Sequence, residues 1–187
     1  MQELSRKHIL IATGVLALLM LLTRTEHFPI SLHLPDASMA VFFLGGVYAR
    51  RHWALAFLML LAVAIDYTAI RFAGVSDYCI TAAYGFLLVS YGVLWYGGRL
   101  CARRGVSRYA LFGALCVCAG VAFLISNGSF YWLGGYVAHP SLIGNAESVW
   151  QWGPEFVGTT LVYGGCILAA CEIWARLKLA RLAHGAV

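Results

Sequence analysis

Charged residues are scarce in this chain. Only 11% of its 187 residues are Asp, Glu, Lys or Arg, whereas 61% are hydrophobic. A soluble domain carries about 25% charged residues. The composition therefore excludes a soluble domain and predicts an integral membrane protein, and the length predicts a single domain over residues 1–187.

Common catalytic and redox motifs are also missing. The sequence contains no HExxH, no P-loop and no GxSG, and its six cysteines include no CxxC pair. Without a nucleotide-binding motif, the chain cannot drive primary active transport by itself. Most of the cysteines lie in or beside apolar segments, where they are expected to be small buried hydrophobic residues.

Six apolar segments are separated by polar stretches. They cover residues 8–22, 37–49, 53–70, 79–96, 109–126 and 154–177. Only helices and closed barrels can span a bilayer, and these runs are too long and too continuously apolar for barrel strands. The sequence therefore predicts an all-α protein with six transmembrane helices, although the second segment is short for a full span.

Basic residues strongly favour one side of this arrangement. They gather before the first segment, between the second and third, between the fourth and fifth, and after the sixth. Only Arg24 and Arg71 fall on the other side. Because cytoplasmic loops carry the excess of Lys and Arg, both termini are predicted to be cytoplasmic.

The three outer stretches, residues 23–36, 71–78 and 127–153, contain the less usual residues. The third is long and aromatic and includes Trp150 and Trp152. Interfacial aromatic residues would explain this composition, and so would a lid over a bulky flat ligand.

Asp66 is the only carboxylate placed well inside an apolar segment. A charge there costs about 2.5–3.5 kcal/mol on insertion scales and is a functional candidate by default. Tyr84 lies five residues into the next segment, as Asp66 lies five residues before Arg71. At 1.5 Å per residue both are expected roughly 7 Å inside, where the Tyr84 hydroxyl can hydrogen-bond the Asp66 carboxylate. A purely structural buried pair is the alternative.

Cys79 is the one cysteine on the outer side. If a helix starts near Asp77, the thiol lies in the first turn, where free N–H groups and the helix dipole favour a thiolate. A thiolate is a strong ligand for transition metals. His27 lies on the same side, so the two could share a metal site, although no zinc spacing is present. A passive small residue and a solvated histidine remain the alternatives.

The six-segment layout and the stretch Asp66…Asp77-Tyr78-Cys79…Tyr84 resemble the BtuM group of predicted bacterial cobalamin transporters. These are similar to the S-components of energy-coupling factor (ECF) transporters. The resemblance implies an ECF S-component-like fold in the bacterial inner membrane, with a pocket facing the periplasm. It implies Cys79 as ligand of the corrin cobalt and places the other pocket residues at His27, Asp66, Tyr78, Tyr84, Trp150 and Trp152.

The resemblance also implies the chemistry and the partners. Cobalamin, with its cobalt, is the expected cargo, and loss of its cyanide ligand opposite the Cys79 thiolate is the expected modification. The first segment carries Ala12, Gly14 and Ala17 rather than the AxxxA pattern of S-components, so solitary action is favoured over an ECF energising module. The alternative functions are a membrane thiol or quinone oxidoreductase, a metal-binding membrane enzyme, or a structural subunit.

Overall fold

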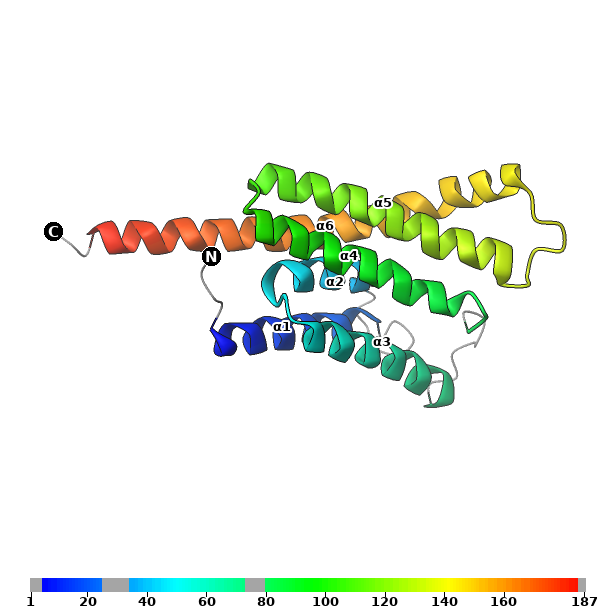
Figure 1. The fold of residues 1–187 in the computed structure, drawn as a ribbon, viewed down its shortest axis with the longest axis horizontal. Helices are drawn as coiled ribbons and strands as arrows, with labels where there is room; N and C mark the ends of the chain where they lie inside the picture. The colour runs from blue at the N-terminus through cyan, green and yellow to red at the C-terminus, as the bar shows by residue number, and fades with distance from the viewer. Residues whose placement is uncertain (1–4, 25–33, 73–79, 185–187) are drawn as a thin grey trace.

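The computed structural model describes residues 5–24, 34–72 and 80–184. Within these ranges the chain is helical and contains no strand (Figure 1). The helices are α1 (Arg6–Arg24), α2 (Ser38–Tyr48), α3 (His52–Phe72), α4 (Tyr84–Arg104), α5 (Arg108–Leu133) and α6 (Leu142–His184). The predicted all-α class is confirmed for the described residues, and each helix corresponds to one of the six apolar segments.

The short helix α2 is the centre of the structure. It packs against each of the other five helices, and nearly all of its residues are buried. Its 11 residues extend about 16 Å at 1.5 Å per residue, roughly half of a bilayer's hydrocarbon core. The segment is apolar all round because protein, rather than lipid or water, surrounds it.

Glycine allows α2 to approach α4 closely. A Cβ at Gly46 would collide with the backbone carbonyl of Trp95, and one at Gly98 would collide with the carbonyl of Phe43. A Cβ at Gly45 would strike the indole ring of Trp95. Small residues at a helix crossing permit backbone contact in this way, so these glycines let the two helices approach closely.

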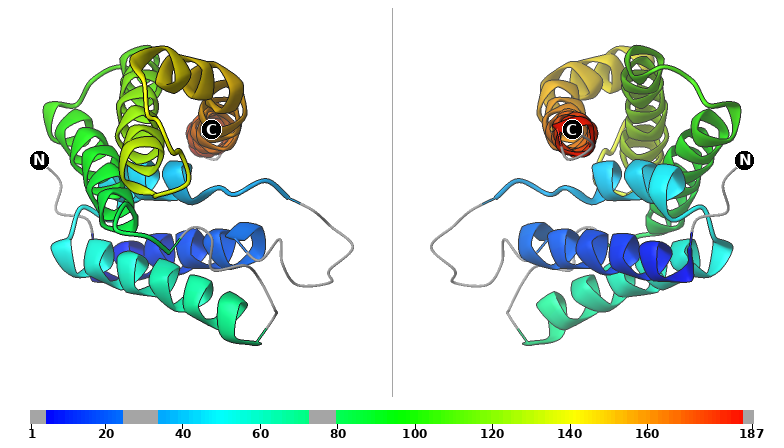
Figure 2. Two further views of the ribbon diagram at one scale, coloured as in Figure 1. Left: turned by 90° about the vertical axis from the view of Figure 1, so that its right-hand side faces the viewer. Right: turned by 90° about the vertical axis from the view of Figure 1, so that its left-hand side faces the viewer.

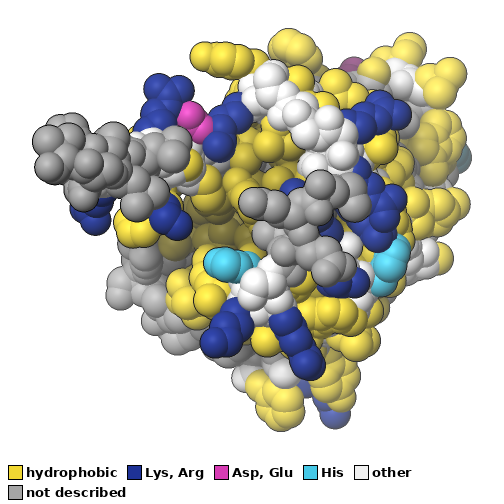
Figure 3. All heavy atoms as spheres, turned by 60° about the vertical axis from the view of Figure 1, so that its left-hand side comes forward, with side chains coloured by type: hydrophobic (Ala, Val, Ile, Leu, Met, Phe, Trp, Pro, Cys, Tyr) yellow, Lys and Arg dark blue, Asp and Glu magenta, His cyan; other side chains and the backbone are white. Residues whose placement is uncertain are grey.

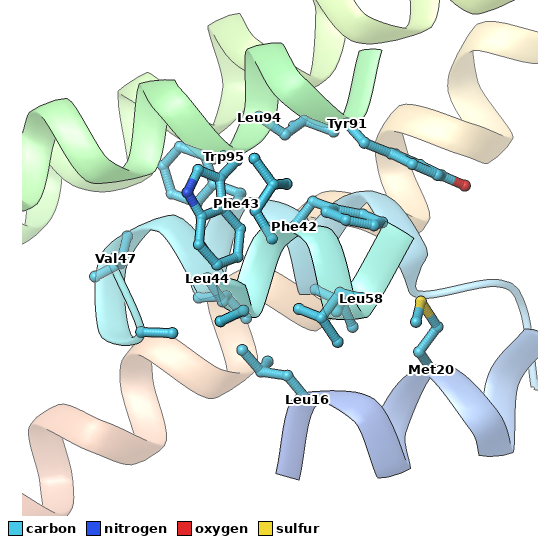
Figure 4. Close-up of a cluster of buried hydrophobic side chains, with 14 of the residues drawn as sticks. Leu16, Met20, Phe42, Phe43, Leu44, Val47, Leu58, Tyr91, Leu94 and Trp95 are labelled. Atoms are coloured by element: carbon cyan, nitrogen blue, oxygen red, sulfur yellow. The ribbon is translucent and has the colours of Figure 1, made fainter. Parts of the chain in front are cut away.

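Large side chains fill the space around this crossing (Figure 4). Phe42 and Trp95 are fully buried, and Tyr91 is nearly so. The rings of Phe42 and Tyr91 stack with centroids 4.0 Å apart and planes 13° apart. Below α2, Leu16 and Met20 of α1 close the core.

The outer surface of the helices is apolar. Ile11, Leu60 and Val117 are between 64% and 70% exposed, which suits contact with lipid rather than water. Among the described helices, α1, α3, α5 and α6 are long and apolar enough to cross a membrane. The helix α4, rich in glycine and tyrosine, and the short α2 are not in this group, so four helices long and apolar enough to span a membrane are described where six spans are predicted.

Helices α5 and α6 form a long hairpin that changes one prediction. Residues 127–153 are predicted to be an outer loop, but α5 continues to Leu133 and α6 starts at Leu142. A helix can continue past an apolar run because its backbone bonds are internal, and the prediction ended each helix where the run ended. Figure 2 shows α6 changing direction along its length, and Pro154 lies inside it. Proline removes one backbone hydrogen bond of the helix and bends it.

The two ends of the bundle differ in charge. The start of α1, the α2–α3 and α4–α5 junctions and the end of α6 lie toward one end, which is called the basic end below (Figure 1). Lys and Arg side chains gather on this end, with few acidic side chains among them (Figure 3). The predicted grouping of the basic clusters is thus present in the fold. The opposite end holds the end of α1, the end of α3 and the start of α4.

Candidate functional site

A polar cluster lies at the end of the bundle opposite the basic end. It is called the Arg24 cluster, and its members come from α1, α3, α4 and the start of α2. They are Arg24, Asp36, Ser38, Asp66, Tyr84 and Tyr91.

Arg24 and Asp66 form a two-pronged ion pair. Arg24 Nε donates to Asp66 Oδ1 at 2.6 Å, and Arg24 Nη2 donates to Asp66 Oδ2 at 2.7 Å. The side chains of Arg24 and Asp66 are 9% and 21% exposed. Paired, planar contacts of this kind are among the stronger charge-assisted hydrogen bonds. The ion pair joins the last residue of α1 to α3 and neutralises the carboxylate that the sequence marks as unusual.

The remaining nitrogen of the guanidinium extends the cluster to α2 and α4. Arg24 Nη1 donates to the Ser38 hydroxyl at 2.8 Å and to the Tyr91 hydroxyl at 2.7 Å. It also lies 3.4 Å from Asp36 Oδ2. Arg24 therefore bonds to groups on three other parts of the chain, and its position depends on all of them.

Asp36 is bound more tightly to the start of α2 than to Arg24. Its Oδ1 accepts from the Ser38 amide at 2.9 Å and from the Ser38 hydroxyl at 2.6 Å. A carboxylate is stabilised at a helix N-terminus by free N–H groups and the dipole. Thr23 Oγ1 accepts from the Ala37 amide at 3.2 Å and ties the same turn to α1.

Tyr84 provides a further hydrogen bond to Asp66. Its hydroxyl donates to Asp66 Oδ2 at 2.6 Å, so the hydrogen bond predicted between these two side chains is confirmed. The structural basis differs from the prediction. The helix α4 begins at Tyr84, and residues 80–83 form a turn before it. Tyr84 is therefore the first residue of α4 rather than a residue five positions into it, and a helix start near Asp77 falls outside the described residues.

Three predicted site residues, His27, Tyr78 and Cys79, lie outside the described residues. In the sequence, His27 follows Arg24 by three residues and Cys79 precedes Tyr84 by five. Trp150 and Trp152 are described, but as part of helix α6 and not of a loop. Trp150 is 83% exposed. Between described residues, no hydrogen bond or ring contact joins either tryptophan to the Arg24 cluster.

Sequence reasoning used Arg24 only to assign topology and missed it as the centre of the cluster. A signal was available, because an intramembrane carboxylate needs a partner and only Arg24 and Arg71 are basic on that side. Ser38 and Tyr91 carried no such signal. The cluster can hold polar groups of a ligand through Asp66 and Tyr84, which are partly exposed. Within the described ranges, no group of three or more His, Cys, Asp or Glu side chains is placed to hold a metal ion.

No protein-family model matches the chain, and no curated protein matches it. The Arg24 cluster and the sequence therefore carry the functional argument.

Proposed function

We propose that this protein binds and takes up cobalamin in the bacterial inner membrane, with the Cys79 thiolate as an axial ligand of the corrin cobalt. The observation that carries the proposal is the Arg24–Asp66–Tyr84 arrangement. It closes a polar corner between α1, α3 and α4 at the end opposite the basic end. The sequence segments with His27 and Cys79 adjoin this corner, one after Arg24 and one before Tyr84.

The Arg24 cluster has two roles in this proposal. Its ion pair fixes the ends of α1 and α3, from which the ligand-bearing segments continue. The partly exposed Asp66 carboxylate and Tyr84 hydroxyl then provide hydrogen-bonding groups for the amide rim of a corrin ring. In the proposal Tyr78 and His27 complete the pocket wall, whereas Trp150 and Trp152 belong to helix α6 rather than to a loop over the pocket.

The proposed chemistry is ligand exchange at cobalt. The Cys79 thiolate donates an electron pair to cobalt and displaces the nucleotide base, which leaves with its own pair. Strong donation from sulfur weakens the bond to cyanide on the opposite face, and cyanide departs with the bonding pair. The oxidation state of cobalt is unchanged, so no reductant is needed for this step. The soft thiolate suits a transition metal.

The visible absorption spectrum of cyanocobalamin tests the proposal directly. Purified wild-type protein is expected to shift the spectrum from that of the free vitamin, and Cys79→Ala is expected to abolish the shift. Cys118→Ala is the matched control, because Cys118 is a half-buried packing residue of α5 and its loss should leave the shift intact. An unshifted spectrum with wild-type protein, or an equal shift with Cys79→Ala, would refute thiolate ligation.

The side of the membrane that the pocket faces and the independence of the protein from an ECF energising module need separate measurements. A membrane-impermeant maleimide added to intact spheroplasts should label Cys79 and not Cys118, if the pocket faces the periplasm. For solitary action, the gene should restore cobalamin-dependent growth to a transport-deficient strain that has no ECF energising module. Restoration only when such a module is supplied would refute solitary action but leave cobalamin binding standing.

A further inference from the structure

Two buried hydrogen-bond donors on α4 have no partner among the described residues. They are Nε1 of Trp95 and Nε of Arg99. The two residues are four positions apart on one helix, so their side chains lie on the same face. Buried polar groups in native proteins are almost always bonded, so each of these two donors calls for an acceptor.

The donor of Trp95 is directed toward the basic end. The side chain is fully buried, and its six-membered ring packs where a Cβ at Gly45 would be. Figure 4 shows the indole nitrogen on the Val47 side of the ring, away from Phe42 and Tyr91. Arg99 follows Trp95 by one helical turn in that direction.

The guanidinium of Arg99 is oriented but not neutralised. Its Nη1 lies 2.7 Å from Nε2 of His52 at the start of α3. Because a guanidinium only donates, Nε2 must accept, and the histidine proton is on Nδ1. Nδ1 can then donate to the Tyr96 hydroxyl, 3.3 Å away. These contacts orient the guanidinium of Arg99 through a neutral histidine, so the positive charge of Arg99 stays uncompensated.

The surroundings of Arg99 add more positive charge. Arg50 and Arg51 precede His52, and Arg103 follows Arg99 by one turn. None of these arginines takes part in an ion pair with another described residue. The one acidic side chain described at this end, Glu172, is already paired with Arg108 and Arg176. The basic end in Figure 3 accordingly carries a large excess of dark blue side chains.

This site lies at the level where a helix long enough to span a membrane begins. His52 is the first residue of α3, one of the helices long and apolar enough to span a bilayer. Trp53 and Tyr96 beside it are about half exposed, as is typical of aromatic residues at the membrane–water interface. Phospholipid phosphates occupy this level of a bilayer.

We propose that Trp95 Nε1 and Arg99 Nε bind one phosphate group at the junction of α2, α3 and α4. The ligand chemistry is a phosphoryl oxygen that accepts from both donors while its charge offsets the arginines around it. An anionic phospholipid headgroup and free phosphate share this chemistry. The site is remote from the Arg24 cluster and does not rest on cobalamin binding.

Native mass spectrometry and thermal unfolding of the detergent-purified full chain test this site. Phosphatidylglycerol, phosphatidylcholine and inorganic phosphate are titrated separately. If the source is an anionic lipid, phosphatidylglycerol should be retained and should raise the unfolding midpoint more than phosphatidylcholine, with little effect of inorganic phosphate. An equal or larger effect of inorganic phosphate would assign the site to the free anion.

Variants distinguish the site from general attraction to a basic surface. Arg99→Gln should weaken binding roughly tenfold to a hundredfold, as expected for loss of a hydrogen bond to a charged group. Trp95→Phe, which retains most of the ring packing, should also weaken it. Arg104→Gln is the control, since Arg104 is an exposed arginine near the same end, and it should bind as wild type does. Equal losses in Arg99→Gln and Arg104→Gln, or no lipid or phosphate binding by wild type, would overturn the proposal and leave a buried water as the acceptor.

Discussion

Loss of the Arg24 side chain should destabilise the protein by leaving Asp66 as an uncompensated carboxylate. Removing one partner of a buried ion pair costs about 3–5 kcal/mol. Arg24 is 9% exposed but Asp66 is 21% exposed, so solvent screens part of the remaining charge. We therefore expect Arg24→Gln to lower the free energy of unfolding by about 3 kcal/mol, at the low end of that range.

A double-mutant cycle separates the ion pair from the other bonds of Arg24. Asp66→Asn alone should cost less than Arg24→Gln, because Arg24 keeps its contacts with Asp36, Ser38 and Tyr91. The double variant Arg24→Gln/Asp66→Asn should be more stable than the sum of the single losses predicts. Groups in one network show coupling of about 0.5–3 kcal/mol, and this pair should lie in the upper half of that range.

Chemical unfolding in detergent micelles, followed by tryptophan fluorescence, measures these free energies. Arg71→Gln is the matched control. It removes the other basic residue of this end, an exposed side chain in the last turn of α3, and should cost less than about 1 kcal/mol. The reasoning fails if Arg24→Gln is as stable as Arg71→Gln, or if the losses at Arg24 and Asp66 simply add.

Three further predictions concern other contacts. Tyr84→Phe removes one hydroxyl that donates to a carboxylate and should cost about 1.5–3 kcal/mol in the same unfolding assay; an unchanged free energy would contradict the observed bond. Gly46→Ala places a methyl group against the Trp95 carbonyl and should cost about 1–3 kcal/mol. Gly14→Ala, where a Cβ meets nothing, should instead be neutral or stabilising by up to about 1 kcal/mol, and equal effects of the two glycine variants would refute the close crossing. Glu172→Gln breaks two largely exposed ion pairs and should change stability by no more than about 1 kcal/mol.

The membrane character and the helical segments followed from the sequence because both depend on local composition. A continuous apolar run must be helical in lipid, since only internal hydrogen bonds satisfy its backbone. For the same reason the centres of the helices were predictable and several ends were not. The start of α4 at Tyr84 lies inside the fourth apolar run, and the helical residues 142–153 lie outside any run, so hydropathy alone does not locate either helix end.

The sequence also identified Asp66 as unusual and Tyr84 as its hydrogen-bond partner, because both lie near the segment that joins two consecutive helices. It did not identify Arg24, which is 42 residues from Asp66. Nothing local specifies which distant cation will meet a carboxylate. The packing of α1 against α2 and α3 made that choice.

Composition and hydropathy by themselves thus determined a helical membrane protein with an isolated carboxylate and a strongly basic side. Only the tertiary structure decided that α2 is a buried centre rather than a span and that Arg24 neutralises Asp66. It also decided that Trp95 and Arg99 each bury a hydrogen-bond donor with no partner among the described residues. Each of these depends on which helices come into contact. Contact between distant segments is set by side-chain packing and by glycines such as Gly46, whose effect appears only when the second helix is in place.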